Sequence, residues 1–173
     1  MTGARVAIAL VLAGLLMAAP GAGAGAAPPP DLGSVDRIVP AAHPYDENAD
    51  ARMEVDQALE RARANGHRVL VTLGGNWCPD CRVLGGAFAL PALKTFIDSH
   101  FETVAVDVGR LNKNMDIPAR FGVGKLAGVP TVLVLSPEGT LLNPSDLIAL
   151  GDARTMSADA IASWLAQWVA PPG

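Results

Sequence analysis

The feature that most constrains the fold of this chain is a pair of cysteines placed where a buried strand is expected to turn into a helix. Cys78 and Cys81 are the only cysteines in the 173-residue sequence. They follow the apolar, β-branched run 69–73, which is typical of a buried strand. Pro79 suits the first position of a helix because it has no N–H to leave unpaired. We therefore expect a strand that ends just before Cys78 and a helix that begins just after it.

Two thiols in this position form a candidate redox pair. A sulfur at the start of a helix meets the free N–H groups of the first turn and the positive end of the helix dipole, which both favour the reactive thiolate. Residues three apart on a helix are neighbours, so we expect the sulfur of Cys81 within bonding distance of the sulfur of Cys78. A purely structural disulfide is the competing interpretation. Because a bridge that closes so short a loop removes little entropy from the unfolded chain, we favour a bond that opens and closes.

Length and composition are those of one globular domain with its own core. Half of the residues are hydrophobic, and the net charge is −4. The sequence has no basic stripe, and its one tyrosine, four phenylalanines and three tryptophans leave little for base stacking. We therefore do not expect nucleic acid as a partner.

The first 26 residues are expected to be an export signal. Arg5 precedes the uncharged apolar stretch 6–19, and small residues follow with two A-x-A cleavage sequences, at 22–24 and 24–26. The apolar stretch is shorter than the ~20 residues that a membrane-spanning helix needs, which favours a cleaved signal over an uncleaved anchor. We predict a signal peptide over 1–26 and an exported protein, with the bacterial periplasm as the expected compartment.

The rest of the chain divides into a proline-rich N-terminal extension over 27–50 and a domain over 51–170. Within the domain, apolar periodicity and turn residues predict alternating helices and strands. The expected helices are 51–65, 79–89, 91–100, 116–121 and one after Ser157 that carries Trp164 and Trp168 on an inward face. The expected strands are 68–73, 101–108, 131–135 and, as the partner in a hairpin, 140–142.

The order of these elements predicts a parallel pair with a right-handed crossover and further antiparallel strands. The fold class is therefore α/β, a central mixed β-sheet with helices on both faces.

Two adjacent glycines lie inside the helix expected over 79–89. Gly85 and Gly86 each cost ~1 kcal/mol relative to alanine in a helix interior. Glycine lets another segment come close, because it has no side chain to keep that segment away. We therefore expect another part of the backbone to lie against this helix.

With these patterns in place, the sequence resembles the thioredoxin superfamily. The resemblance rests on Trp-Cys-Pro-Asp-Cys at 77–81, after a strand, and on Gly-Val-Pro-Thr at 128–131, before a later strand. The two motifs together are much more specific than either alone, and the resemblance covers roughly 51–169. It implies a thioredoxin-like fold and thiol–disulfide exchange with protein substrates. With its extension and export signal, the chain is similar to the periplasmic members.

The resemblance also implies roles for single residues. Cys78 would be the attacking thiolate and Cys81 the buried resolving thiol. Pro130 would be the family's cis-proline, which turns the backbone of Val129 toward an extended substrate peptide. Trp77 would be the surface tryptophan beside the nucleophile and would contribute to substrate binding.

Three neighbours of these residues, Pro79, Asp80 and Thr131, would have supporting roles. The resemblance implies no bound cofactor, because the redox centre is the Cys78–Cys81 disulfide itself. The expected partners are protein thiols and disulfides, together with a redox partner that the sequence does not identify. A membrane electron donor is one candidate for that partner.

The chain departs from the family pattern near the two cysteines. Many thioredoxins carry a buried acid six positions before the first cysteine, where this chain has Thr72. A water or an acid from elsewhere, such as Asp107, would have to take the proton of Cys81. Asp80 puts a negative charge near the thiolate, and Arg82 acts in the opposite direction. Since the Pro-His dipeptide of strong oxidants is absent and Asp80 should not stabilise a reduced thiolate, we favour a reductase over an oxidase.

A copper- or zinc-binding or delivery module is the alternative function. Two thiolates and a histidine can hold either metal, and the candidate histidines are His43, His67 and His100. A closed zinc site needs four ligands, and neither His67 nor His100 is expected near the cysteines. His43, in the N-terminal extension, could fold over them. We favour the redox interpretation over metal binding.

Overall fold

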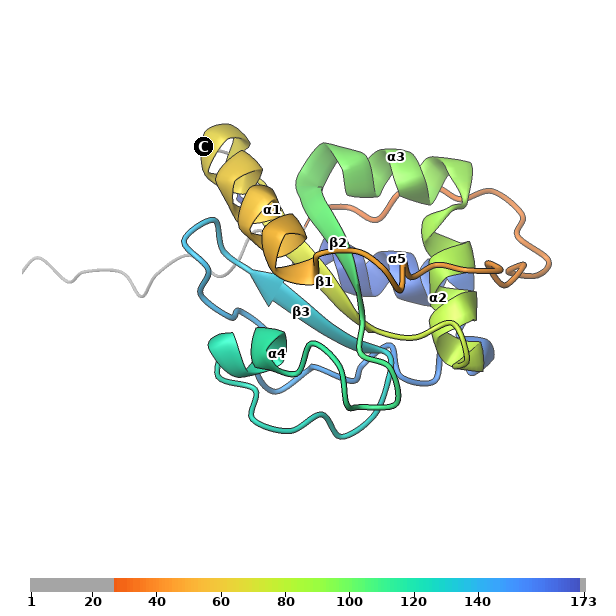
Figure 1. The fold of residues 1–173 in the computed structure, drawn as a ribbon. Helices are drawn as coiled ribbons and strands as arrows, with labels where there is room; N and C mark the ends of the chain where they lie inside the picture. Colours follow the sequence, from red (N-terminus) through yellow and green to blue (C-terminus); the bar gives the residue numbers. More distant parts are fainter. Residues whose placement is uncertain (1–26, 172–173) are drawn as a thin grey trace, which may run out of the picture.

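The computed structural model describes residues 27–171, so the export signal predicted over 1–26 lies outside the described residues. Its elements, in chain order, are α1 (Ala51–Asn65), β1 (Arg68–Gly74), α2 (Pro79–Phe88), α3 (Pro91–His100), β2 (Phe101–Asp107), α4 (Asp116–Arg120), β3 (Thr131–Leu135), the 3-10 helix η1 (Ala153–Thr155) and α5 (Ala158–Ala166) (Figure 1). The predicted elements agree closely with these bounds, except for the strand expected over 140–142. The last helix also ends before Trp168, which lies just beyond it.

Strand β1 is the centre of a three-stranded mixed sheet with the order β2-β1-β3. It pairs in parallel with β2, with Arg68 opposite Phe101 at one end and Gly74 opposite Asp107 at the other. It pairs in the antiparallel sense with β3, where Leu73 is opposite Thr131. The predicted parallel pair and mixed sheet are confirmed.

Helices cover both faces of this sheet, as predicted (Figure 1). Helices α1 and α4 pack on one face, in a core that includes Val69, Val71 and Leu73 of β1. Helices α2, α3 and α5 pack on the other face, around Leu70 of β1 and Val132 of β3. Successive side chains of a strand point to opposite faces, so β1 supplies both cores and is buried along its whole length.

The strand predicted over 140–142 is wrong, because the structure has only a single bridge there, between Leu141 and the last residue of β3. Asn143 takes the place of the next strand residues. Its side chain accepts a hydrogen bond from the N–H of Val134 at 2.8 Å and donates one to the carbonyl of Val132 at 2.9 Å. A side chain that bonds to backbone groups in this way competes with the hydrogen bonds of a second strand. The hairpin therefore ends after one bridge.

The segment 27–50, called the strap below, lies against α2 (Figure 1). The N–H of Ala41 donates to the carbonyl of Arg82 at 2.8 Å, and the Nε of Arg82 donates to the carbonyl of Ala41 at 2.9 Å. A Cβ on Gly86 would overlap the carbonyl oxygen of Val39, and one on Gly85 would lie 2.6 Å from a side-chain carbon of Pro44. The close approach of another segment, expected from the two glycines, is confirmed.

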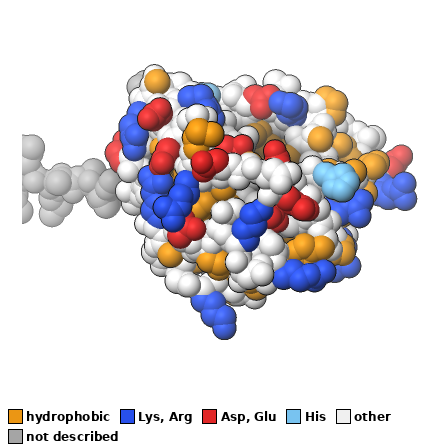
Figure 2. Space-filling model, in the orientation of Figure 1, with side chains coloured by type: hydrophobic (Ala, Val, Ile, Leu, Met, Phe, Trp, Pro, Cys, Tyr) orange, Lys and Arg blue, Asp and Glu red, His pale blue; other side chains and the backbone are white. Residues whose placement is uncertain are grey.

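The surface of the described residues mixes charges of both signs with scattered apolar side chains. On the face drawn in Figure 2, acidic and basic side chains lie next to one another around apolar patches. Trp77 and Leu111 are among the large hydrophobic residues that this surface exposes. Within residues 27–171, each helix is too short or too polar to cross a membrane.

Candidate active site

The two thiols share the first turn of α2. Cys78 is the N-cap residue with extended backbone, and its Sγ accepts a hydrogen bond from the N–H of Cys81 at 3.3 Å. Pro79 is the first helical residue, as predicted. Cys78 and Cys81 are both free thiols in the structure. The chain therefore presents a dithiol at the strand-to-helix turn that the sequence predicts.

The dithiol lies at the end of the sheet, outside the two main cores. Cys78 is 4% exposed and Cys81 is 1% exposed. With Tyr45 they form a small cluster of their own, which Val129 flanks. The pair is therefore accessible only through the small exposed part of Cys78, while Cys81 is covered.

The loop before β3 covers one side of Cys78. The Val129–Pro130 peptide bond is cis, as the family resemblance implies. The Sγ of Cys78 donates a hydrogen bond to the carbonyl of Val129 at 3.5 Å. Thr131 supports the loop, because its Oγ1 donates to the carbonyl of Gly128 at 2.7 Å. The fold thus brings the two sequence motifs into contact.

Trp77 lies at the surface, next to Cys78 in the sequence. Its ring is held at two points by the loop that follows β2, because Nε1 donates to the carbonyl of Gly109 at 2.7 Å and the guanidinium carbon of Arg110 lies 4.8 Å from the ring centre. Although these contacts hold the ring, 44% of the residue is exposed to solvent. A fixed, exposed indole with a cation over its face is suited to contact a partner protein.

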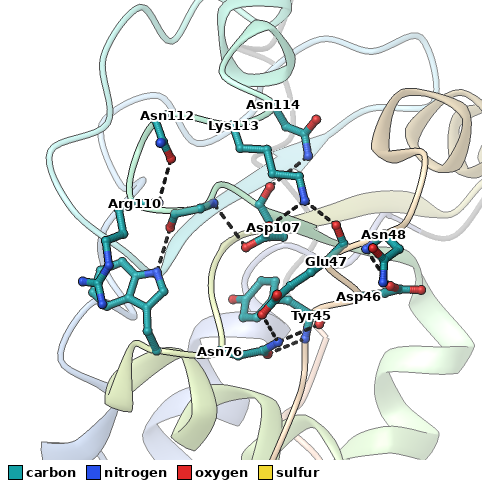
Figure 3. A network of polar contacts seen from close by, with 12 residues as sticks. Tyr45, Asp46, Glu47, Asn48, Asn76, Asp107, Arg110, Asn112, Lys113 and Asn114 are labelled. Atoms are coloured by element: carbon teal, nitrogen blue, oxygen red, sulfur yellow. Dashed lines mark hydrogen bonds and ion pairs between the residues drawn. The ribbon is translucent and has the colours of Figure 1, made fainter.

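Asp107, which the sequence offers as a proton acceptor for Cys81, holds this loop instead (Figure 3). One carboxylate oxygen accepts from the Nζ of Lys113 at 2.8 Å, and the other accepts from the N–H of Gly109 at 3.2 Å. The Nζ of Lys113 also donates to the carbonyl of Glu47 in the strap. The carboxylate is therefore committed to the loop after β2 and to the strap.

The structure corrects the expectation that Asp80 acts against the thiolate with Arg82 as its counter-charge. Arg82 bonds to Ala41 of the strap, and Arg154 of η1 is the partner of Asp80. The backbone N–H and the Nε of Arg154 each donate to a carboxylate oxygen of Asp80 at 3.0 Å. The hydrogen bond and charge of Asp80 raise the pKa of Arg154, and the charge of Cys78 adds to the effect. The positive charge that offsets Asp80 thus comes from a residue far along the chain.

Tyr45 is the residue at this site that sequence reasoning missed. It is the only tyrosine of the chain. It belongs to the strap and is buried, with 4% of its surface exposed. The side chain of Asn76 holds its backbone on both sides, accepting from its N–H at 3.1 Å and donating to its carbonyl at 2.9 Å (Figure 3). A Cβ on Gly74 would lie 2.7 Å from the Sγ of Cys81 and closer still to the hydroxyl of Tyr45. The one sequence feature that could have drawn attention to Tyr45 is its position as a lone tyrosine after a proline-rich stretch.

Burial controls the protonation of Cys81 and of its neighbour Tyr45. Burial first, and then the neighbouring Cys78, raise the pKa of Cys81 to about 12, while the backbone at Gly75 and the hydroxyl of Tyr45 act in the opposite direction. Burial also raises the pKa of Tyr45 well above its ordinary value. Near neutral pH both groups carry their protons, so Cys81 needs help to become a nucleophile.

A cavity of about 290 Å³ under the strap reaches Cys81. Tyr45, Thr72 and Cys81 line it, together with Lys94 and Asp98 of α3. Thr72 therefore faces the region beside Cys81 where many thioredoxins would carry an acid, but it brings a hydroxyl group.

The histidines named for the metal alternative do not meet at the thiols. His67 precedes β1 and His100 ends α3, so both lie at the opposite end of β1 from Cys78. His43 is an exposed residue of the strap. Within the described residues, histidine, cysteine and acidic side chains form no group of three or more that could hold a metal ion.

The chain is similar to known proteins in sequence and in fold. Residues 50–137 match the family model described as thioredoxin-like. The crystal structure of a disulphide isomerase from Xylella fastidiosa Temecula1 is 33% identical, with a TM-score of 0.68, and the match covers 72% of this chain and 95% of that one. A DsbH oxidoreductase is 20% identical over 65% of this chain and 78% of that one, with a TM-score of 0.43. A Pseudomonas aeruginosa protein of unknown function is 21% identical over 69% and 84%, with a TM-score of 0.37. No curated protein matches the sequence.

Proposed function

The chain belongs to the thioredoxin-like family, and from this premise we propose that it is a thiol–disulfide oxidoreductase acting on protein substrates through Cys78 and Cys81. The observation that carries the proposal is the free dithiol in the first turn of α2, with the Sγ of Cys78 against the carbonyl that precedes Pro130. The similar Xylella protein is named a disulphide isomerase, and isomerases also work by exchange between thiols and disulfides.

The proposed reaction has two exchange steps. The Cys78 thiolate attacks one sulfur of a substrate disulfide, forms a mixed disulfide and releases the other substrate sulfur, which takes up a proton. Cys81 then attacks the Sγ of Cys78, and the second substrate sulfur leaves. The substrate gains two electrons and two protons, and the protein retains the Cys78–Cys81 disulfide. The exposed ring of Trp77 and the backbone of Val129 would position the substrate chain.

We favour the reductase direction, in which a redox partner returns the pair to the dithiol. The dipeptide Pro79-Asp80 differs from the Pro-His that the family resemblance associates with strong oxidants. The sequence argument from the charge of Asp80 no longer applies, because Arg154 pairs with that charge. The dipeptide difference is therefore the main support for the reductase direction. The reduction potential against glutathione is the test: a value of about −270 mV supports a reductant, and one of about −120 mV an oxidant.

Reduction of insulin disulfides tests the exchange activity itself. The wild type should reduce insulin when a dithiol reductant is supplied, and Cys78→Ser should not. Cys81→Ser should accumulate a mixed disulfide through Cys78, because the resolving sulfur is missing. Both substitutions are nearly isosteric, and thermal unfolding shows whether they fold. Equal rates for the wild type and Cys78→Ser would exclude the proposal.

Export to the periplasm, with a membrane electron donor as one candidate partner, completes the proposal. The N–H of Ala27 bonds to the carbonyl of Ala166, so a chain that starts after the predicted signal keeps its first described contact. Cell fractionation tests the point. The full chain should appear in the periplasm with residues 1–26 removed, and a chain without them should stay in the cytoplasm.

A further inference from the structure

The strap contributes a chemical group to the site as well as covering it. We propose that the hydroxyl of Tyr45 donates a hydrogen bond to the Sγ of Cys81 and stabilises the thiolate that resolves the mixed disulfide. This inference rests on the proposed exchange function and deepens it, because it names the group that assists the second step in a chain with Thr72 in place of an acid.

The geometry places the hydroxyl and the sulfur together. Tyr45, Cys78 and Cys81 form one buried cluster. The hydroxyl of Tyr45 and the Sγ of Cys81 both come so close to Gly74 that a Cβ at that position would meet the two atoms. Gly74 is the last residue of β1, so the absence of its side chain opens the space in which hydroxyl and thiol meet.

The tyrosine can act as a donor and is unsuited to act as a base. Its hydroxyl lies beside Cys81, and Tyr45, Thr72 and Cys81 line the same cavity, where a buried tyrosine hydroxyl usually finds a polar partner. Because burial raises the pKa of Tyr45, the hydroxyl keeps its hydrogen at the pH of the reaction. A protonated donor next to a sulfur favours the charged form of that sulfur.

Several contacts hold the strap in place independently of the hydroxyl. Asn76 bonds to both backbone groups of Tyr45. Arg82 and Ala41 exchange two hydrogen bonds before it, and Lys113 bonds to the carbonyl of Glu47 after it. The removal of the hydroxyl alone should therefore leave the strap where it is.

The charged groups around Cys81 are already paired with others. From α3, Lys94 and Asp98 line the same cavity and bond to each other at 2.6 Å. At the end of β2, Asp107 bonds to Lys113 at 2.8 Å. Cys78, at the start of α2, raises the pKa of Cys81 in the dithiol form, but it carries no charge once its sulfur is part of the mixed disulfide. The Tyr45 hydroxyl is thus the side-chain donor that works in favour of the Cys81 thiolate.

In the resolving step, the thiol of Cys81 gives its proton to solvent water, which the cavity can admit. The thiolate, with the Tyr45 hydroxyl as donor, attacks the Sγ of Cys78. The bond between Cys78 and the substrate sulfur breaks as the Cys78–Cys81 bond forms. The substrate sulfur leaves as a thiolate with the electron pair of the broken bond and takes a proton from solvent, so atoms and charge balance.

Single-turnover reaction with a chromogenic aromatic disulfide separates the two steps. The first release of the coloured thiol reports the attack by Cys78, and the second reports the resolution by Cys81. Tyr45→Phe should slow the second release about tenfold relative to the first, since a hydrogen bond to a charged group is lost. Tyr45→Leu, which also loses the ring, is the comparison. If Tyr45→Phe keeps the wild-type ratio and only Tyr45→Leu is slow, the residue serves packing and the inference is overturned.

A titration tests the hydrogen bond without any exchange reaction. In the Cys78→Ala chain, Cys81 is the single thiol, so its ionisation can be followed by thiolate absorbance against pH. Addition of Tyr45→Phe should raise the pKa of Cys81. An unchanged pKa would overturn the inference even if the wild type reduces insulin. A raised pKa in a protein that does not reduce insulin would support the hydrogen bond and reject the proposed function.

Discussion

The Nε of Arg154 lies 3.0 Å from a carboxylate oxygen of Asp80, so a residue of η1 offsets the negative charge that lies two residues after Cys78 in the sequence. Asp80 is 8% exposed, and its other oxygen accepts the backbone N–H of Arg154. A carboxylate at this depth needs such partners, because burial without them is costly. The pair therefore fixes η1 against the active-site helix and offsets a charge beside Cys78.

Arg154→Met is expected to weaken both functions of this pair. The free energy of unfolding should fall measurably, because the buried carboxylate of Asp80 loses its charged partner. Alkylation of Cys78 should also be slower, because the unpaired charge of Asp80 acts against its thiolate. Asp80→Asn added to Arg154→Met should restore the alkylation rate.

The matched control is Arg52→Met, which breaks an ion pair with Asp116 whose side chains are 71% and 46% exposed. Exposed pairs contribute little, so the free energy of unfolding should change by less than ~1 kcal/mol. Denaturant unfolding gives the stabilities, and single-turnover alkylation gives the reactivity of Cys78. Similar effects of both substitutions would contradict the special role of Arg154.

The contact between the strap and α2 leads to a second prediction, for Gly86→Ala. In an open helix this change should stabilise by ~1 kcal/mol. Here the new methyl group would overlap the carbonyl of Val39, so we expect a net loss of roughly 1–3 kcal/mol from overpacking and faster proteolysis of the strap. Gly124→Ala is the control, because a Cβ there has open space. A stable, protease-resistant Gly86→Ala protein would contradict this account of the strap.

The sequence predicts the fold well wherever the signal is local. Periodicity and capping residues determine β1, α2 and their junction at Cys78, and two adjacent glycines reveal that something lies against α2. The prediction fails where a side chain competes with the backbone, as Asn143 does with the expected hairpin. It also fails for contacts between distant segments. The pairing of Arg154 with Asp80 and the place of Tyr45 over Cys81 depend on tertiary packing that no local pattern contains.

A third prediction concerns the alkaline stability of the dithiol and disulfide forms. In the folded dithiol form, burial raises the pKa of Cys81 from 9.0 to about 12. Between these values the unfolded chain releases the thiol proton while the folded chain keeps it. The resulting contribution to stability is complete below about pH 9 and is lost as the pH rises toward 12. The disulfide form has no such thiol, and its stability should fall less over the same range.

Denaturant unfolding of both forms at a series of alkaline pH values measures this difference. Tyr45 titrates in both forms, so its contribution largely cancels in the comparison. Cys81→Ala under reducing conditions is the control, because it removes the thiol and should behave like the disulfide form. Parallel stability curves for the dithiol and disulfide forms would show that Cys81 is not held in its protonated state.

The exposed ring of Trp77 gives the last prediction, which separates substrate binding from chemistry. The ring is 44% exposed and fixed by Gly109 and Arg110, so it can contact a protein substrate without a loss of its own freedom. Trp77→Ala should lower kcat/KM for insulin about tenfold, as the loss of an aromatic contact at an interface does. A small aromatic disulfide reaches only the sulfur of Cys78, so its rate should change about twofold or less.

Met53→Ala on α1 is the control, because it removes a side chain from a residue of similar exposure, 52%. It should alter neither rate. An equal loss of both activities in Trp77→Ala would mean that the ring supports the nucleophile and does not bind the substrate.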